Sequence, residues 1–150
     1  MTYDSTQDTL DHIQKVQRRI QQMLDNLSAR ALVHDASKLV EPEKSGYDLL
    51  TINLKDCTYG SDEYKAALAE AKPTIEHHYS VNAHHPEHNS NGIDGMSLLD
   101  ILEMLADWSA ASQRTKQGSI AQSLVHNKTR FGISDQLASI LENTVRELGW

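Results

Sequence analysis

The chain has 150 residues, a formal net charge of −7 and hydrophobic side chains at 39% of its positions. This length is enough for one domain with one buried core and too short for two ordinary domains, so we expect a single domain over residues 1–150. The acidic charge argues against a nucleic-acid polymer as partner, because binding to its backbone needs a basic surface.

Three features of the sequence predict a cytoplasmic protein. Met1–Leu10 is polar and acidic, so we expect no secretory signal there. Cys57 is the only cysteine, which excludes an internal disulfide and suits a reducing cytosol. The longest apolar region, Met96–Ala111, is interrupted by three acidic residues, so we expect no membrane span.

Apolar residues at helical spacing predict an all-α fold, a single compact bundle of about six or seven helices. In chain order we expect helices over Thr6–Asp25, from a Ser28 cap to Leu39, from Pro42 to about Asp56, after Ser61 through His78 with a kink or restart at Pro73, over Met96–Arg114, after Gly118 to about Lys128, and from Ser134 onward. Gly60-Ser61 and Gln117-Gly118 are expected between helices, and Ser80–Gly95 is the one long irregular stretch. Long loops in compact domains are often functional.

The predicted helix Met96–Arg114 is apolar nearly all round and yet carries acids at i, i+3 and i+7, namely Asp100, Glu103 and Asp107. Buried carboxylates need a metal, a cation or hydrogen-bond donors. Asp107 is therefore a candidate metal ligand. For Glu103 and Asp100 we favour either a hydrogen bond to a metal ligand, without contact to the metal itself, or exposure to solvent.

A histidine, an adjacent His-Asp pair and a distant aspartate stand in an order that can supply one metal site. His12, His34, Asp35 and Asp107 offer imidazole and carboxylate ligands to a divalent ion if each projects inward from a different helix. His12 borders the apolar stripe of the first predicted helix, so an ordinary surface position is its alternative interpretation.

Five of the eight histidines lie between His77 and His88. Helical spacing predicts that His78 points inward and that His77 does not. We favour His78 and His85 as additional metal ligands. The remaining candidates in this region are assigned to substrate contacts, and they are Asn82, His84 and His88. The alternative is a polar, solvated loop that happens to be rich in histidine.

The order His12, His34-Asp35, Asp107 resembles the HD-domain superfamily of metal-dependent phosphohydrolases, over about Asp8–Gln113. His34-Asp35-Ala36-Ser37-Lys38 is similar to the HD-x-G-K form of its motif, with Ser37 where a glycine is usual. The stretches His77–His88 and Glu103–Trp108 are similar to an uncharacterised HD-like family common in bacterial and phage genomes.

This resemblance implies an all-helical fold with His12, His34, Asp35 and Asp107 as ligands of a metal. It further implies that Lys38 approaches the substrate phosphate. Extra histidines between the His-Asp pair and the last aspartate resemble the dinuclear members, so one or two ions are expected. Nucleotidases of this group commonly have a glutamate where this chain has Lys38, which leaves the general acid or base unidentified.

The sequence therefore predicts a phosphohydrolase for a nucleotide or a similar small phosphate ester, with Asp35 and Lys38 in catalytic roles and Arg19 as a further anchor for phosphate. The ligand types suit Mn, Fe, Co, Ni and Zn alike. Two alternatives stay open: a di-iron oxygenase, and a metal-containing module that binds a nucleotide without turnover. The sequence is compatible with a homo-oligomer and does not fix the oligomeric state.

Overall fold

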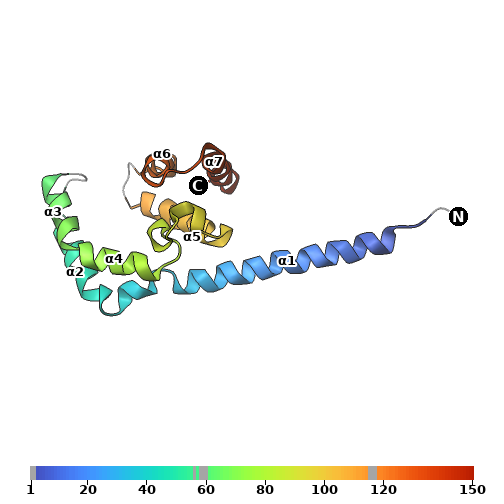
Figure 1. Ribbon diagram of the computed structural model, residues 1–150, viewed down its shortest axis with the longest axis horizontal. Helices are drawn as coiled ribbons and strands as arrows, with labels where there is room; N and C mark the ends of the chain where they lie inside the picture. The colour runs from blue at the N-terminus through green and yellow to red at the C-terminus, as the bar shows by residue number, and fades with distance from the viewer. Residues whose placement is uncertain (1–2, 56, 58–60, 115–117) are drawn as a thin grey trace. The chain divides into compact units, whose positions relative to one another are not determined.

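The structure, a computed structural model, describes residues 3–55, 57, 61–114 and 118–150. These residues form seven α-helices and three short 3₁₀ helices and contain no strand, which confirms the predicted all-α fold class (Figure 1). The chain divides into two units, Met1–His34 and Asp35–Trp150. No helix in the described part of the chain combines the length and the apolar character that crossing a membrane requires.

The first unit consists of one continuous helix, α1 (Thr6–Val33), of 28 residues. The predicted break between Asp25 and Ser28 is therefore wrong. The residues around Ser28 include leucine, alanine and arginine, which favour helix, and neither glycine nor proline occurs before the helix ends. None of the α1 residues is buried, so this unit has no hydrophobic core of its own.

The second unit contains all the other helices. They are η1 (Ala36–Leu39), α2 (Glu43–Leu54), α3 (Asp62–Glu70), α4 (Lys72–Val81), η2 (Pro86–His88), η3 (Gly92–Gly95), α5 (Leu98–Ser112), α6 (Ile120–Phe131) and α7 (Asp135–Leu148). The helix restarts near Pro73 as predicted, because Pro73 stands in the first turn of α4, where its missing N–H leaves no bond unmade. The predicted boundary residues Asp56, Gly60 and Gln117 lie outside the described residues.

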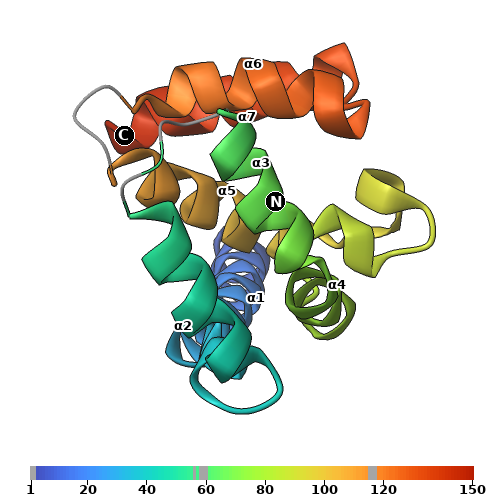
Figure 2. The same ribbon diagram turned by 90° about the vertical axis from the view of Figure 1, so that its left-hand side faces the viewer.

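The larger core of the second unit forms around α5, and Figure 2 shows α6 and α7 lying side by side above α5. Met104 and Leu105 on α5 are 1% and 0% exposed, as expected for a central apolar helix. A smaller cluster of Leu50, Ala67 and Ala71 joins α2 to α3. The acids on α5 are therefore carried by a helix that the core holds in place.

Asp100 has a structural role at the start of α5. Its Oδ2 accepts hydrogen bonds from the backbone N–H and the hydroxyl of Ser97, while the Ser97 hydroxyl accepts from the Asp100 N–H. This is a capping box, whose signature is a serine followed three residues later by an acid. The carboxylate of Asp100 is therefore occupied by the helix end rather than by a ligand.

Candidate metal centre

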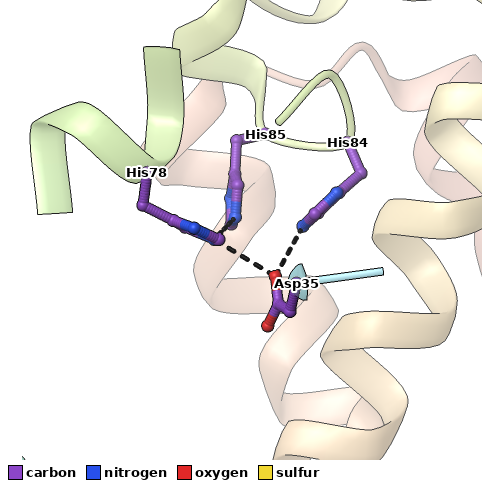
Figure 3. A group of neighbouring side chains, drawn as sticks. All are labelled: Asp35, His78, His84 and His85. Carbon is purple, nitrogen blue, oxygen red and sulfur yellow. Dashed lines mark hydrogen bonds and ion pairs between the residues drawn. The ribbon is translucent and has the colours of Figure 1, made fainter. Parts of the chain in front are cut away.

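Four side chains from three segments of the second unit converge on one point (Figure 3). Asp35 Oδ1 lies 3.2 Å from Nε2 of His78 and 3.5 Å from Nε2 of His84. Nε2 of His85 lies 2.9 Å from Nε2 of His78. One ligand atom from each residue lies within 4.8 Å of every other, which is the spacing that a single ion between them requires.

Asp35 enters the cluster from an unusual backbone conformation. Its φ is 56° and its ψ is 13°, the left-handed region, which aspartate adopts more readily than most residues with a side chain. Oδ2 accepts a 2.6 Å hydrogen bond from Nζ of Lys38, one turn further on in η1. Burial by itself raises the pKa of Asp35, but its bonds with His78, His84 and Lys38 outweigh burial and hold that pKa below its usual range.

His78 and His84 each approach Asp35 with one ring nitrogen and a glutamate with the other. Nδ1 of His78 lies 2.9 Å from Oε2 of Glu43, and Nδ1 of His84 lies 3.2 Å from Oε1 of Glu103. Both imidazoles are buried, at 1% and 3% exposure. An imidazole that donates its far N–H to a carboxylate presents a lone pair on its other nitrogen, which is the usual support of a metal-bound histidine.

His85 completes the cluster as a neutral imidazole. Burial, followed by the neighbouring His84 and His78, lowers the pKa of His85 to about 3. At neutral pH its Nε2 can therefore offer a lone pair, although the structure places it against another imidazole nitrogen. Tyr79 on α4 lies against the His85 ring, with the ring centroids 4.7 Å apart.

The charges around the cluster favour a cation. A carboxylate oxygen of Asp107, on α5, lies within 4.8 Å of one on Asp35. Glu43 and Glu103 stand behind the two buried histidines. The ammonium of Lys38 contacts Asp35, and its Nζ also lies 4.9 Å from the centroid of the Tyr47 ring. Like-charged carboxylates at such distances repel one another unless a positive charge lies between them.

Two predicted site residues on α1 are too far from the His-Asp pair. His12 precedes His34 by 22 residues, or about 33 Å along one continuous helix, so the two cannot bind one ion within the same chain. Arg19 is about 22 Å from His34 by the same measure, and its guanidinium contacts Gln22. Both assignments fail because the predicted break in the first helix does not exist. His34 is the last residue of the first unit, and its role as a ligand stays a prediction.

The structure also locates the predicted substrate contacts. Asn82 directs its amide nitrogen toward protein atoms, donating to Ser37 Oγ at 2.9 Å and to the His78 carbonyl at 2.8 Å. His88 is exposed on η2 and belongs to none of the candidate metal groups found among the described residues. His84, predicted to contact substrate, is instead buried at the centre of the cluster.

Glu43 is the residue that the sequence analysis missed. It is the first residue of α2, where an acid is ordinary because it complements the helix dipole. Its hydrogen-bond partners, His77 and His78, lie 34 and 35 residues further along the chain. The packing of these distant residues also buries it. No local pattern could have found it, whereas the predicted inward orientation of His78 is confirmed.

Residues 1–147 match a family of unknown function (DUF5662), and the chain belongs to that family. Searches of curated proteins and of solved structures found no match. A function for this chain is therefore inferred from the geometry of its candidate metal centre.

Proposed function

We propose that this protein is a metal-dependent phosphohydrolase that acts on a nucleotide or a similar small phosphate ester. The observation that carries the proposal is the convergence of one carboxylate and three imidazoles, Asp35 with His78, His84 and His85, within 4.8 Å. When bound, a divalent ion supplies a Lewis acid for a phosphoryl oxygen and lowers the pKa of water.

The donor atoms fit such an ion. Imidazole nitrogen and carboxylate oxygen together suit Mn, Fe, Co, Ni and Zn. Nε2 of His78 and Oδ1 of Asp35 both act as acceptors once Glu43 takes the other side of the His78 ring, and at 3.2 Å they need a proton or a cation between them. Asp107 and His34 remain proposed ligands, of this ion or of a second one.

Lys38 supports the choice of a phosphate substrate. Its side chain is 29% exposed, so its ammonium is partly desolvated and yet accessible beside the cluster. Asp35 holds one side of the ammonium and the ring of Tyr47 lies on another. A lysine ammonium fixed in this way acts as a compact point charge, which suits the neutralisation of a phosphate oxygen.

A second candidate is a module that holds a metal and a nucleotide without turnover. Lys38 stands one turn after Asp35, where the resembled nucleotidases commonly have a glutamate. The two glutamates nearest the histidines, Glu43 and Glu103, each contact an imidazole. Both observations leave a catalytic base unassigned. The same ligand set also suits the third candidate, a di-iron oxygenase.

A panel of nucleotides and small phosphate esters tests the proposal. The full chain, purified without chelator, is incubated with each compound and with Mn²⁺, Co²⁺, Fe²⁺ or Zn²⁺, with and without oxygen. Phosphate release in the absence of oxygen supports the phosphohydrolase. Oxygen consumption that requires iron indicates the oxygenase instead, and thermal stabilisation by a nucleotide without any product indicates the binding module.

A further inference from the structure

A completely buried carboxylate lies directly behind the candidate metal centre. Glu43 is 0% exposed, and both of its oxygens are engaged. Oε2 accepts hydrogen bonds from the Ser37 hydroxyl at 2.8 Å and from Nδ1 of His78 at 2.9 Å, while Oε1 accepts from Nδ1 of His77 at 2.9 Å. A buried charge is tolerated only when donors surround it in this way.

These contacts fix the orientation of the His78 ring. An ionised carboxylate only accepts hydrogen bonds, so Nδ1 of His78 is the atom that donates to Glu43. Nε2 is thereby directed at Oδ1 of Asp35, at 3.2 Å, where a proton or a cation must lie between the two atoms. Asn82 restrains the same assembly, because its amide donates both to Ser37 Oγ and to the backbone carbonyl of His78.

Glu43 is charged in spite of its burial. Burial by itself raises the pKa of Glu43, but the hydrogen bonds from His77, Ser37 and His78 outweigh it and hold that pKa below its ordinary value. A charged acceptor polarises an imidazole more strongly than a neutral one does and makes the opposite nitrogen a better ligand. Both effects, on orientation and on basicity, act through His78.

We propose that Glu43 is a positioning residue of the metal centre, which holds the His78 ring with Nδ1 toward its own carboxylate and Nε2 toward the site of the ion even before an ion binds. The inference depends on the proposed metal site. It adds that the ligands need Glu43 to orient His78. His77 shares the carboxylate but has a side chain 41% exposed, so water can replace it as a donor. Removal of His77 is therefore the matched control.

The first experiment examines the metal-free full chain. Nitrogen-15 NMR of the imidazoles shows whether Nδ1 of His78 carries a proton and donates it in a hydrogen bond. We expect a hydrogen-bonded proton on Nδ1 in the wild type and in Glu43→Gln, which keeps an oxygen acceptor, and we expect Glu43→Met to lose this hydrogen bond. Thermal melting of each variant establishes that it is folded. An unprotonated Nδ1 of His78 in the wild type would overturn the proposal.

The second experiment measures metal affinity by calorimetric titration with Mn²⁺ and Zn²⁺. Loss of such a supporting carboxylate typically weakens metal binding by about 10- to 100-fold, so we expect about 100-fold for Glu43→Met and about 10-fold for Glu43→Gln. His77→Ala should bind as the wild type does. Wild-type affinity in folded Glu43→Gln, or an equal loss in Glu43→Gln and His77→Ala, overturns the proposal.

The two experiments separate this inference from the proposed function. If the wild type binds no metal, the proposed function fails, and the NMR measurement still decides whether Glu43 controls the proton of His78. If the wild type binds metal and the Glu43 variants bind it equally well, the positioning role fails while the metal site stands. Should Glu43→Met not fold, Glu43→Gln alone decides the affinity test.

Discussion

Nε2 of His78, on α4, lies 2.9 Å from Nε2 of His85, in the loop before η2. Two imidazole nitrogens at this distance repel each other unless a proton or a metal ion lies between their lone pairs. His78 also directs the same nitrogen at Asp35 Oδ1. The fold therefore brings three acceptor atoms that need a shared positive charge together around one ring nitrogen of His78.

The metal-free protein should lose stability in acid. The pKa of His85 is about 3 in the fold, below its ordinary value of 6.5, so the unfolded chain binds a proton that the folded one rejects. The stabilising contribution of neutral His85 is therefore complete above about pH 6.5 and declines as the pH falls toward 3. The lowered pKa of Asp35 acts in the same direction at lower pH, because the unfolded chain takes up a proton on this carboxylate at a pH where the folded chain does not.

Urea unfolding of chelator-treated protein between pH 7.5 and pH 4 measures this effect. We expect the midpoint to fall with pH, and to fall less steeply in His85→Gln, which cannot take up the proton. His126→Gln is the matched control, because His126 is exposed on α6. A midpoint that rises as the pH falls through 6 would contradict the assignment of His85.

Lys38→Met tests the role of the ammonium in phosphate binding. The substitution keeps the length of the side chain and removes a positive charge beside Asp35, so metal binding should not weaken. Loss of a preorganised charge that stabilises the transition state typically costs about two to three orders of magnitude in rate, and we expect kcat/KM to fall by about that much. Steady-state kinetics and metal analysis on one preparation give both numbers.

Lys44→Met is the control for this substitution. Lys44 contacts Asp48 one turn along α2, and both side chains are exposed. Its kcat/KM should equal that of the wild type. If Lys38→Met also retains full kcat/KM, the ammonium does not act on substrate, and its contact with Asp35 is only a partly buried ion pair.

Glu103→Gln should weaken the centre without unfolding the chain. The carboxylate lies 3.2 Å from Nδ1 of His84 and is 14% exposed, and glutamine keeps both its shape and an oxygen acceptor. We expect metal affinity or turnover to fall by about 10- to 100-fold, with little change in the melting temperature. Calorimetric titration measures the metal affinity of the variant, and thermal melting measures its melting temperature. Unchanged affinity and rate would mean that His84 needs no carboxylate behind it.

His12→Ala should leave metal binding unchanged. The 28 residues of α1 form one helix, which puts His12 about 33 Å from His34, and the side chain is exposed. The resemblance that pairs these two histidines predicts the opposite result. Equilibrium dialysis against Mn²⁺ compares the variant with the wild type, and loss of a bound ion in His12→Ala would show that the order of motifs is the better guide.

Local patterns in the sequence predicted the helices and the inward face of His78. They failed at Ser28, because serine is favoured at the start of a helix and is also tolerated within one, and α1 continues through it without glycine or proline. The inward face of α4 and the acids on α5 could be predicted because each pattern lies within a single helix.

The contacts of the candidate site were less accessible to sequence reasoning. Glu43 reaches His78 across 35 residues, and the position of His84 depends on how its loop meets α5. Such contacts are set by tertiary packing, and neither residue type nor spacing encodes them. The structure brings the predicted ligands Asp35 and His85 into one cluster. That they bind a metal stays a prediction.

The central claim is that Asp35, His78, His84 and His85 hold a divalent ion. Equilibrium dialysis of the chelator-treated full chain against Mn²⁺, Co²⁺ and Zn²⁺, followed by elemental analysis, tests it most directly. We predict at least one ion per wild-type chain, its loss in Asp35→Asn and in His85→Ala, and its retention in His88→Ala. A wild-type chain that binds none of these ions, or an Asp35→Asn, His85→Ala double variant that binds as the wild type does, would contradict the claim.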